Sequence, residues 1–234
     1  MKKSAVVVLL LTSLTAAGLT STLSAQTVEV VARPDFAPHM QALRQQRMAS
    51  EDASQPLMQQ LAKIKSFSAD YQQRVYDIQQ QLLQEGQGKL ALKQHARFRF
   101  ESETPEQSLL VSDGKTLWFY NELLEQVSIY DANSEVGQTP FALLTSTDKA
   151  LWQQYQVTQQ QQSFFIHPLD AGNPVQQLML TFKGDQLVEM QVIDINQQQS
   201  VYLFSKIKVN SSIADKLFTF TVSKNLDVDD QRQR

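Results

Sequence analysis

The chain has 234 residues, 42% of them hydrophobic, and a formal net charge of −3. This length and composition are typical of one or two globular domains with a hydrophobic core, and the small, mixed charge argues against nucleic-acid binding. The sequence contains no cysteine, which excludes disulfides, thiolate metal sites and cysteine nucleophiles. The fold therefore depends on packing and hydrogen bonds.

The N-terminus has the pattern of a secretory signal peptide. Lys2 and Lys3 precede an apolar run at 5–11, and small residues follow up to Ala25. The apolar run is too short to span a bilayer comfortably, so we expect residues 1–25 to be removed and the mature chain to act outside the cytoplasm. A retained membrane anchor is the alternative.

A flexible N-terminal arm and then one helix are expected next. Residues 26–52 contain two prolines, a long polar run and too few apolar positions to bury against a core. From Ser54, which could cap a helix, apolar residues recur at helical spacing, and this predicts an amphipathic helix over 54–65. The apolar positions are Leu57, Met58, Leu61 and Ile64.

After this helix the apolar period changes to two, which predicts β-strands for most of the remaining chain. Turn residues at Asp113-Gly114 and Gly184-Asp185 tolerate positive φ, so consecutive strands should form antiparallel hairpins in a long meander. The predicted strands are 67–77, 82–93, 96–103, 108–112, 115–121, 125–130, 155–159, 162–168, 176–183, 186–194, 199–208 and 217–222.

One helical interruption separates the hairpins. Thr139 is a good N-cap, Pro140 suits the first helical position, and apolar residues follow at Phe141, Leu143 and Leu144. A second apolar pair lies further on, at 151–152. Because these one or two short helices lie between hairpins, we expect them to cover a sheet.

Catalytic and metal-binding patterns are weak. The three histidines lie in separate segments without metal-ligand spacing. The acidic run Asp227–Asp230 could bind a cation, but it lacks the glycine and distal glutamate of a calcium loop, and a solvated tail explains it better. Glu101 and Glu103 share one strand face, which would allow paired carboxylate chemistry, although simple exposure accounts for them too. An exported hydrolase is the weaker hypothesis.

The strongest signal is an excess of large apolar residues in the predicted sheet. Such a sheet has two apolar faces to hide, and only two or three short helices are available. We expect a partly closed barrel whose concave side is covered by those helices, with apolar space between; a densely filled core is the alternative. The residues concerned are Phe98, Phe100, Leu109, Leu110, Leu117, Trp118, Phe119, Phe164, Phe165, Leu178, Met179, Leu180 and Tyr202.

Several runs resemble one known family. They are VSDGKTLWFYN (111–121), EQV (125–127), TPFALLT (139–145), WQQY (152–155), LFTFTV (217–222) and DVDDQR (227–232). In this order they are similar to the periplasmic outer-membrane lipoprotein carrier (LolA) family. The similarity extends from about residue 54 to the C-terminus, which gives a carrier domain over 53–234 and leaves the arm outside it.

The resemblance implies a mainly β fold: an unclosed, strongly curved antiparallel β-barrel, or half-barrel, with a lid of short α-helices over an apolar cavity. It implies a periplasmic, monomeric carrier that accepts triacylated lipoproteins from an inner-membrane ABC transporter and delivers them to an outer-membrane receptor, without cofactor, metal or reaction. A periplasmic carrier of another amphiphile or glycolipid is the alternative. On this hypothesis the acyl-chain cavity is lined by Phe98, Phe100, Leu110, Leu117, Trp118 and Phe119, and the lid carries Phe141, Leu143 and Leu144.

The chain departs from the family pattern in two places. Members carry K-R-P-x-x-F before the strand that contains Phe98, with the Arg as a latch that hydrogen-bonds the lid. Here Gln94 stands at the latch position and His95 replaces the Pro. Gln94 can donate hydrogen bonds but brings no charge, so we expect a weaker closed state. A latch supplied by Lys93 or Arg97 is the alternative, although strand alternation places both on the face opposite Gln94. The tail also lacks the usual Pro and Gly, with a last strand expected from Leu226.

Overall fold

The computed structural model describes residues 52–132, 139–146 and 148–232. The expected signal peptide and all but the last residue of the expected arm lie outside this part of the chain.

No helix among the described residues is long and apolar enough to cross a membrane.

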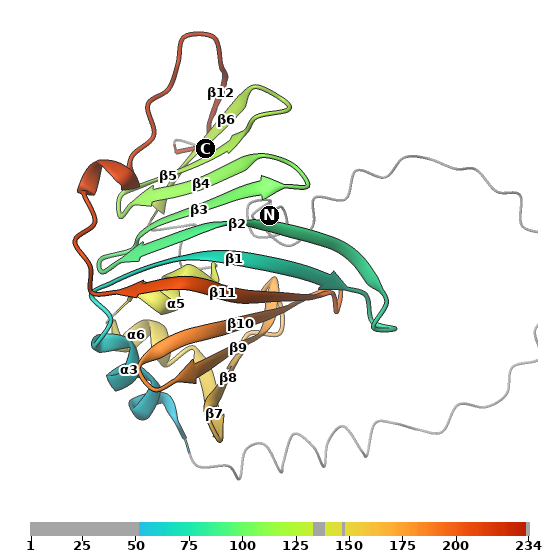
Figure 1. The fold of residues 1–234 in the computed structure, drawn as a ribbon, viewed down its shortest axis with the longest axis vertical. Helices are drawn as coiled ribbons and strands as arrows, with labels where there is room; N and C mark the ends of the chain where they lie inside the picture. The colour runs from blue at the N-terminus through green and yellow to red at the C-terminus, as the bar shows by residue number, and fades with distance from the viewer. Residues whose placement is uncertain (1–51, 133–138, 147, 233–234) are drawn as a thin grey trace, which may run out of the picture. The chain divides into compact units, whose positions relative to one another are not determined.

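The described part is dominated by one strongly curved, 12-stranded sheet (Figure 1). Its strand order is β12-β6-β5-β4-β3-β2-β1-β11-β10-β9-β8-β7. The strands are β1 (Ser66–Tyr76), β2 (Leu82–Lys93), β3 (Arg97–Thr104), β4 (Ser108–Asp113), β5 (Thr116–Asn121), β6 (Gln126–Asp131), β7 (Tyr155–Gln160), β8 (Ser163–Pro168), β9 (Val175–Lys183), β10 (Gln186–Asp194), β11 (Gln199–Val209) and β12 (Asp227–Asp230).

Two antiparallel meanders make up this sheet. Strands β1 to β6 follow one another in space, as do β7 to β11, and the pairing of β1 with β11 joins the two sets. The first eleven predicted strands match observed strands to within one residue at each end. The sheet remains open, because β7 and β12 lie at its two ends without pairing to each other.

The predicted strand at 217–222 is wrong. The chain there forms a short 3₁₀ helix, η2 (Asp215–Phe218), and then an irregular stretch. Phe218 is fully buried, and the ring of Phe220 lies 5.4 Å from that of Tyr120. Alternating aromatic residues gave this stretch the period of a strand, but they anchor it to one face of the sheet by side chains and not by a hydrogen-bonded ladder.

The last strand forms where it was expected, but in a parallel arrangement. Strand β12 pairs with β6, with Asp227 opposite Gln126 and Asp230 opposite Ile129. Every other neighbouring pair in the sheet is antiparallel. We call residues 211–232, which run from β11 through η2 to β12, the C-terminal tail.

The first described helix, α3 (Ser54–Ala62), is shorter than predicted and begins with Ala53, not Ser54, at its N-cap. Its end is set by the Asn210 side chain, which donates to the Lys63 carbonyl at 2.9 Å and accepts from the Lys65 N–H at 2.7 Å. These hydrogen bonds satisfy backbone groups that another helical turn would have used.

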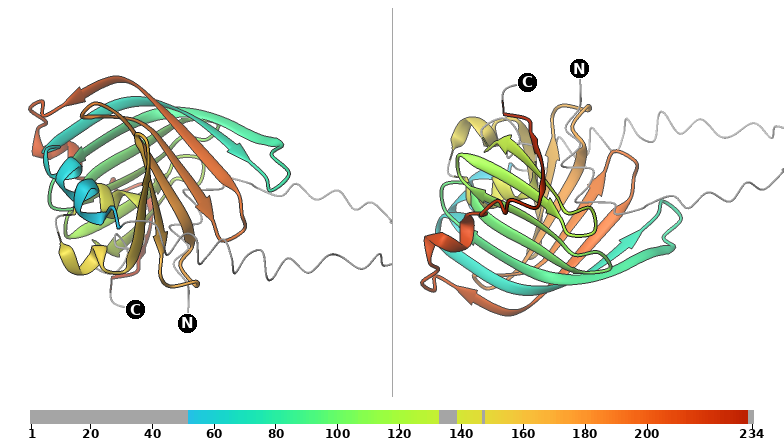
Figure 2. Two further views of the ribbon diagram at one scale, coloured as in Figure 1. Left: turned by 90° about the horizontal axis from the view of Figure 1, so that it is seen from below. Right: turned by 90° about the horizontal axis from the view of Figure 1, so that it is seen from above.

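Three helices cover the concave face of the sheet (Figure 2). They are α3, α5 (Pro140–Thr145) and α6 (Lys149–Trp152). Thr139 holds the N-cap position of α5 in an extended conformation and Pro140 opens the helix, as the sequence predicts. In α6, the Asp148 carboxylate caps the helix by accepting from the Ala150 N–H at 2.8 Å. We refer to α5 and α6 together as the lid.

Candidate functional site

The core under the lid contains five of the six residues that were expected to line a cavity. Phe98 and Phe100 lie on β3, Leu110 on β4, and Leu117 and Phe119 on β5. The register places Phe100 opposite Leu110, and Leu110 opposite Phe119. Residues directly opposite in a sheet share a face. These five side chains therefore form one apolar surface on the concave side.

Trp118 was expected in the same group, and the structure corrects this. It pairs with Val111 on β4 and Ile129 on β6, neither of which belongs to the core under the lid. Because side chains alternate along a strand, Trp118 and Phe119 point to opposite faces. Trp118 lies on the convex face, where the tail's Phe218 and Phe220 also pack.

Helix α5 closes over the concave surface with Phe141. Its ring centroid lies 5.1 Å from that of Phe98 and 5.3 Å from that of Phe100. Phe98 is fully buried, and Phe141 is almost so. The lid thus contacts the sheet at the two aromatic residues that the sequence singled out on β3.

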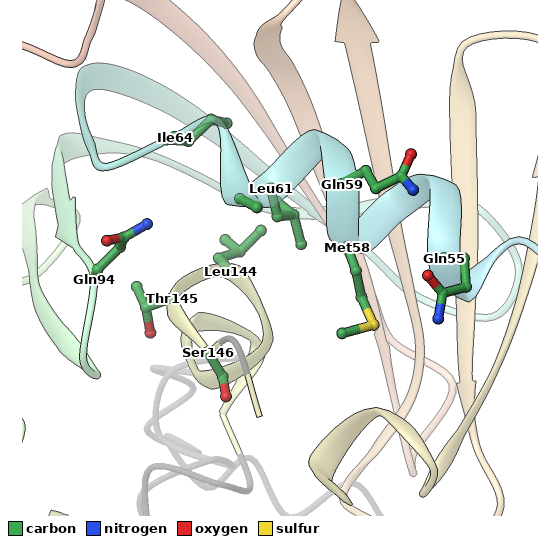
Figure 3. Close-up of a pocket in the computed structure, with 10 residues that line it drawn as sticks. Gln55, Met58, Gln59, Leu61, Ile64, Gln94, Leu144, Thr145 and Ser146 are labelled. Atoms are coloured by element: carbon green, nitrogen blue, oxygen red, sulfur yellow. The ribbon is translucent and has the colours of Figure 1, made fainter. Parts of the chain in front are cut away.

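The other two apolar side chains of α5 contact different elements. Leu143 lines a narrow gap together with Ile166 on β8 and Leu178 on β9. Leu144 faces α3, where it lies near Leu61 (Figure 3). Phe141, Leu143 and Leu144 of α5 therefore contact both halves of the sheet and the neighbouring helix.

A hollow of about 260 Å³ remains at the seam between α3 and α5 (Figure 3). Apart from this seam, side chains fill much of the space under the lid, so the described arrangement combines a packed core with an apolar opening at its rim. The lining residues are Gln55, Met58, Gln59, Leu61, Ala62, Ile64, Gln94, Leu144, Thr145 and Ser146.

Gln94 reaches this seam from the turn between β2 and β3, beside the C-terminal end of α5. Within the described residues, no hydrogen bond joins its amide to the lid. Its turn is unusual, because His95 and Ala96 have φ of 69° and 57°. Two consecutive positive φ values are typical of a type I′ hairpin turn. Proline cannot adopt them, so the turn differs from one with Pro at the position of His95.

Lys93 and Arg97 do not replace a latch. Both bind Asp215 of the C-terminal tail on the convex face, at 2.5 Å from the Lys93 Nζ and 2.9 Å from the Arg97 Nη1. The Lys93 ammonium also donates to the Ile213 carbonyl at 3.1 Å. Their position on the face opposite the lid agrees with strand alternation.

The described side chains that form the core under the lid are uncharged. Burial raises the pKa of Tyr71 and of Tyr202 above the usual range, so both hydroxyls stay neutral. Tyr202 accepts a hydrogen bond of 2.9 Å from the Gln73 amide. Asp194 is the one buried carboxylate in the described part of the chain, and it accepts from backbone N–H groups of its own turn. Trp152 of α6 is also buried, and its indole N–H has no acceptor among the described residues.

The carboxylates considered for catalysis have structural partners. Glu101 pairs with Arg99 at 3.0 Å, and Glu103 pairs with Lys89. Among the described residues, no group of three or more His, Cys, Asp or Glu side chains is placed to hold a metal ion.

An open, curved sheet with an uncharged concave face under short helices defines a class of proteins suited to enclosing apolar ligands. The chain belongs to the LolA family: the family model described as "Outer membrane lipoprotein carrier protein LolA" matches residues 62–221. The expectation of a non-enzymatic protein agrees with this membership, since the relatives are named as carriers.

Relatives with the name "Outer-membrane lipoprotein carrier protein" cover most of the chain. The Histophilus somni protein is 38% identical over 184 residues, which is 78% of this chain and 90% of that protein. The Haemophilus influenzae protein is 36% identical over 188 residues, or 80% and 91%. The Pseudoalteromonas translucida protein is 37% identical over 183 residues, or 77% and 88%.

Solved structures are more distant. A LolA superfamily protein from Nitrosomonas europaea aligns with a TM-score of 0.44 at 12% identity, covering 71% of this chain and 97% of that one. An uncharacterized conserved protein from Thermus thermophilus aligns with a TM-score of 0.48 at 15% identity, covering 76% and 99%.

Proposed function

We propose that this protein is a monomeric periplasmic carrier that accepts triacylated lipoproteins released from the inner membrane by an ABC transporter and delivers them to an outer-membrane receptor. In this proposal the acyl chains bind between the lid and strands β3 to β5. The observation that carries it is the apolar concave face, where Phe98 and Phe100 meet Phe141 of a six-residue helix.

The cargo explains why such a face is needed. At ~0.8 kcal/mol per buried methylene, an acyl chain of about sixteen carbons costs on the order of 12 kcal/mol in water. A protein that shields the chains in an uncharged interior makes transfer from one site to the next nearly neutral. Modest differences in affinity can then set the direction of transfer, whereas very tight binding would trap the cargo.

Loading requires the lid to move. The seam hollow of about 260 Å³ is smaller than the ~300–1,000 Å³ typical of pockets for small ligands. Three acyl chains need more room than that. Displacement of α5 would uncover Phe98 and Phe100, and acyl chains would then take over the contacts of Phe141.

The buried indole N–H of Trp152 supports the same site. An unpaired donor in an apolar interior costs about 1–3 kcal/mol. The ester and amide carbonyls of an acylated cysteine are acceptors of the kind that this donor lacks. We therefore include Trp152 as a candidate contact for the polar part of the lipid.

The proposal is tested by incubating the processed protein with spheroplasts that hold a newly made outer-membrane lipoprotein. We expect the lipoprotein to appear in the soluble fraction as a complex with this protein. Release without the protein, or no release with it, would contradict the proposed step. Recovery of a glycolipid from the purified protein in place of lipoprotein would favour a carrier of another amphiphile.

Phe98→Glu should impair loading or release, because it places a carboxylate between sheet and lid. Circular dichroism and thermal unfolding check that the variant still folds. Normal release by a folded Phe98→Glu variant would count against the site.

Phe119 and Trp118 offer a matched pair on the two faces of β5, since both are partly buried. Phe119→Glu should reduce lipoprotein release, whereas Trp118→Glu should leave it near the wild-type level in protein that remains folded. Equal effects of the two variants would contradict a site confined to the concave face.

A further inference from the structure

Exposed apolar side chains gather at two neighbouring hairpin tips. The turn between β1 and β2 carries Ile78, 65% exposed, with Leu82 and Leu83 at the start of β2, 51% and 39% exposed. The turn between β10 and β11 carries Ile195, 44% exposed. We call Ile78, Leu82, Leu83 and Ile195 the hairpin-tip patch.

The two tips lie side by side. Tyr76 at the end of β1 is opposite Gln199 at the start of β11, and the Gln80 amide donates to the Gln199 side chain at 3.4 Å. The β1–β2 hairpin also extends beyond the neighbouring strands (Figure 1). A flat surface could therefore touch both tips before it met the rest of the sheet.

Among the described residues, the turns at the opposite end of the sheet show no such feature. These turns lie at 94–96, 114–115, 161–162 and 184–185, and none of them carries an exposed large apolar side chain. Single exposed apolar residues are common on protein surfaces. Here, four exposed apolar residues lie on two adjacent hairpin tips at one end of the sheet. They can therefore enter the same apolar phase together, which scattered single residues cannot do.

The surroundings of the patch are polar and carry a slight excess of carboxylates over cations, because Asp77 and Asp194 accept hydrogen bonds from backbone N–H groups and not from a Lys or Arg. Arg74 is paired with Glu85 at 2.9 Å, and the Asp77 carboxylate accepts from the Gln81 N–H at 2.8 Å. Asp194 is buried. The remaining polar positions at the two tips are glutamine and asparagine, at 79–81 and 196–199. Such side chains can hydrogen-bond to lipid headgroups and add no repulsion from anionic lipids.

We propose that the hairpin-tip patch docks this protein reversibly on a lipid bilayer, with its apolar side chains at the boundary between headgroups and acyl chains. A stable protein–protein interface takes about 800 Å² and some 20–30 residues per partner, far more than two hairpin tips supply. A bilayer sets no minimum area, since each inserted side chain contributes separately. The slight excess of carboxylates at the tips favours a headgroup layer without net charge over an anionic one.

The proposed contact between the hairpin-tip patch and the bilayer should be weak. Four partly exposed side chains bury less apolar surface than a single fatty-acyl anchor, and one such anchor alone gives only marginal, reversible membrane binding. The protein would visit the bilayer briefly and leave again. Because no attraction between opposite charges holds the protein on the bilayer, salt should not weaken the contact.

The test uses the protein as its host exports and processes it, with vesicles of zwitterionic phospholipid in a flotation assay. We expect a small floating fraction that grows with lipid concentration and is the same at low and high salt, with or without phosphatidylglycerol. Combining Ile78→Gln, Leu82→Gln, Leu83→Gln and Ile195→Gln should lower the partition coefficient by about tenfold. An Ile78→Trp variant should show a blue-shifted emission when vesicles are added.

The control replaces Leu203 on β11 and Leu217 in η2 by Gln, since these side chains are 45% and 39% exposed and lie away from the hairpin tips. We expect this variant to float like the wild type. The proposal is overturned if the wild type does not float, if the patch and control variants behave alike, or if floating needs anionic lipid. Concentration-dependent dimerisation that the patch variant abolishes, or binding only to membranes that contain protein, would also overturn it. Lipoprotein release from spheroplasts is measured separately, so its failure leaves this result standing.

Discussion

Adjacent side chains of β5 serve different surfaces. Phe119 joins the core under the lid, and Trp118 faces the convex side, where the C-terminal tail packs. The run of four large residues at 117–120 is therefore covered twice, by the lid on one face and by the tail on the other. In the proposed function, only the covering on the lid side is exchanged for cargo.

The latch position is the residue where this chain should differ most from Arg-bearing members of the family. Gln94 lies beside the last turn of α5, the end of a helix at which backbone carbonyls are not used by a further helical turn. Gln94→Arg places a cation with several donors at that helix end, and this should hold the lid closed more firmly. We expect slower lipid uptake and reduced binding of a hydrophobic dye.

Gln94→Lys serves as the control for charge without the guanidinium geometry and should have a smaller effect. Unchanged dye binding and lipid affinity in Gln94→Arg would show that this position does not act on the lid.

The turn that carries Gln94 also gives a prediction for its next residue, His95. His95 is exposed and has a φ of 69°. His95→Pro, which restores the residue of the family pattern, should lower the free energy of unfolding by about 3 kcal/mol, because Pro cannot adopt this φ. His95→Gly, which tolerates it, should be neutral or slightly stabilising. Denaturant unfolding measures both. Wild-type stability of His95→Pro would mean that the turn adopts another conformation.

At the scale of elements, α3 and α5 are attached differently. The Ala53 N–H donates to the Val157 carbonyl at 3.0 Å, the Gln60 amide to the Gly184 carbonyl at 2.9 Å, and Lys63 pairs with Asp185. These polar contacts tie both ends of α3 to the sheet. Helix α5 meets the sheet through Phe141 and Leu143, contacts that acyl chains can replace. We expect α5 to move during loading while α3 stays in place.

The C-terminal tail is an element that the sequence predicted only in part. Alternating apolar residues are shared by a strand and by an extended segment that packs its side chains on a sheet, so 217–222 could not be told from a strand. The end of α3 at Ala62 could not be predicted from the local sequence either. Its terminating contacts come from Asn210, which is far away in the sequence.

Phe218 should anchor the tail. It is fully buried on the convex side, whereas its neighbour Leu217 is 39% exposed. Phe218→Ala should lower the free energy of unfolding by about 3–5 kcal/mol, or release the tail to protease, because truncating a buried Phe removes many contacts. Leu217→Ala is the control and should cost much less. Similar effects of the two variants would contradict the anchoring role.

Across the whole described molecule, the sequence predicted the positions of the strands better than it predicted which distant strands pair. Strand positions followed from the period-two pattern and from turn residues such as Gly114 and Gly184, which are set locally. The β1–β11 pairing and the parallel β12 depend on contacts between distant segments, which local patterns do not encode. Of the six residues that were predicted to line a cavity, Trp118 lies on the face opposite the other five, and choosing between neighbours on one strand requires the register.

The proposed carrier function requires that the acyl chains of the cargo lie between the lid and the concave face. It is tested most directly by loading the protein with a lipoprotein that carries a photoactivatable acyl chain and mapping the cross-linked residues by mass spectrometry. If the acyl chains bind there, we expect cross-links at Phe98, Phe100, Phe119 and Phe141, and none at Trp118. Cross-links that gather on Trp118 and the convex face, or their absence from a complex that does form, would contradict it.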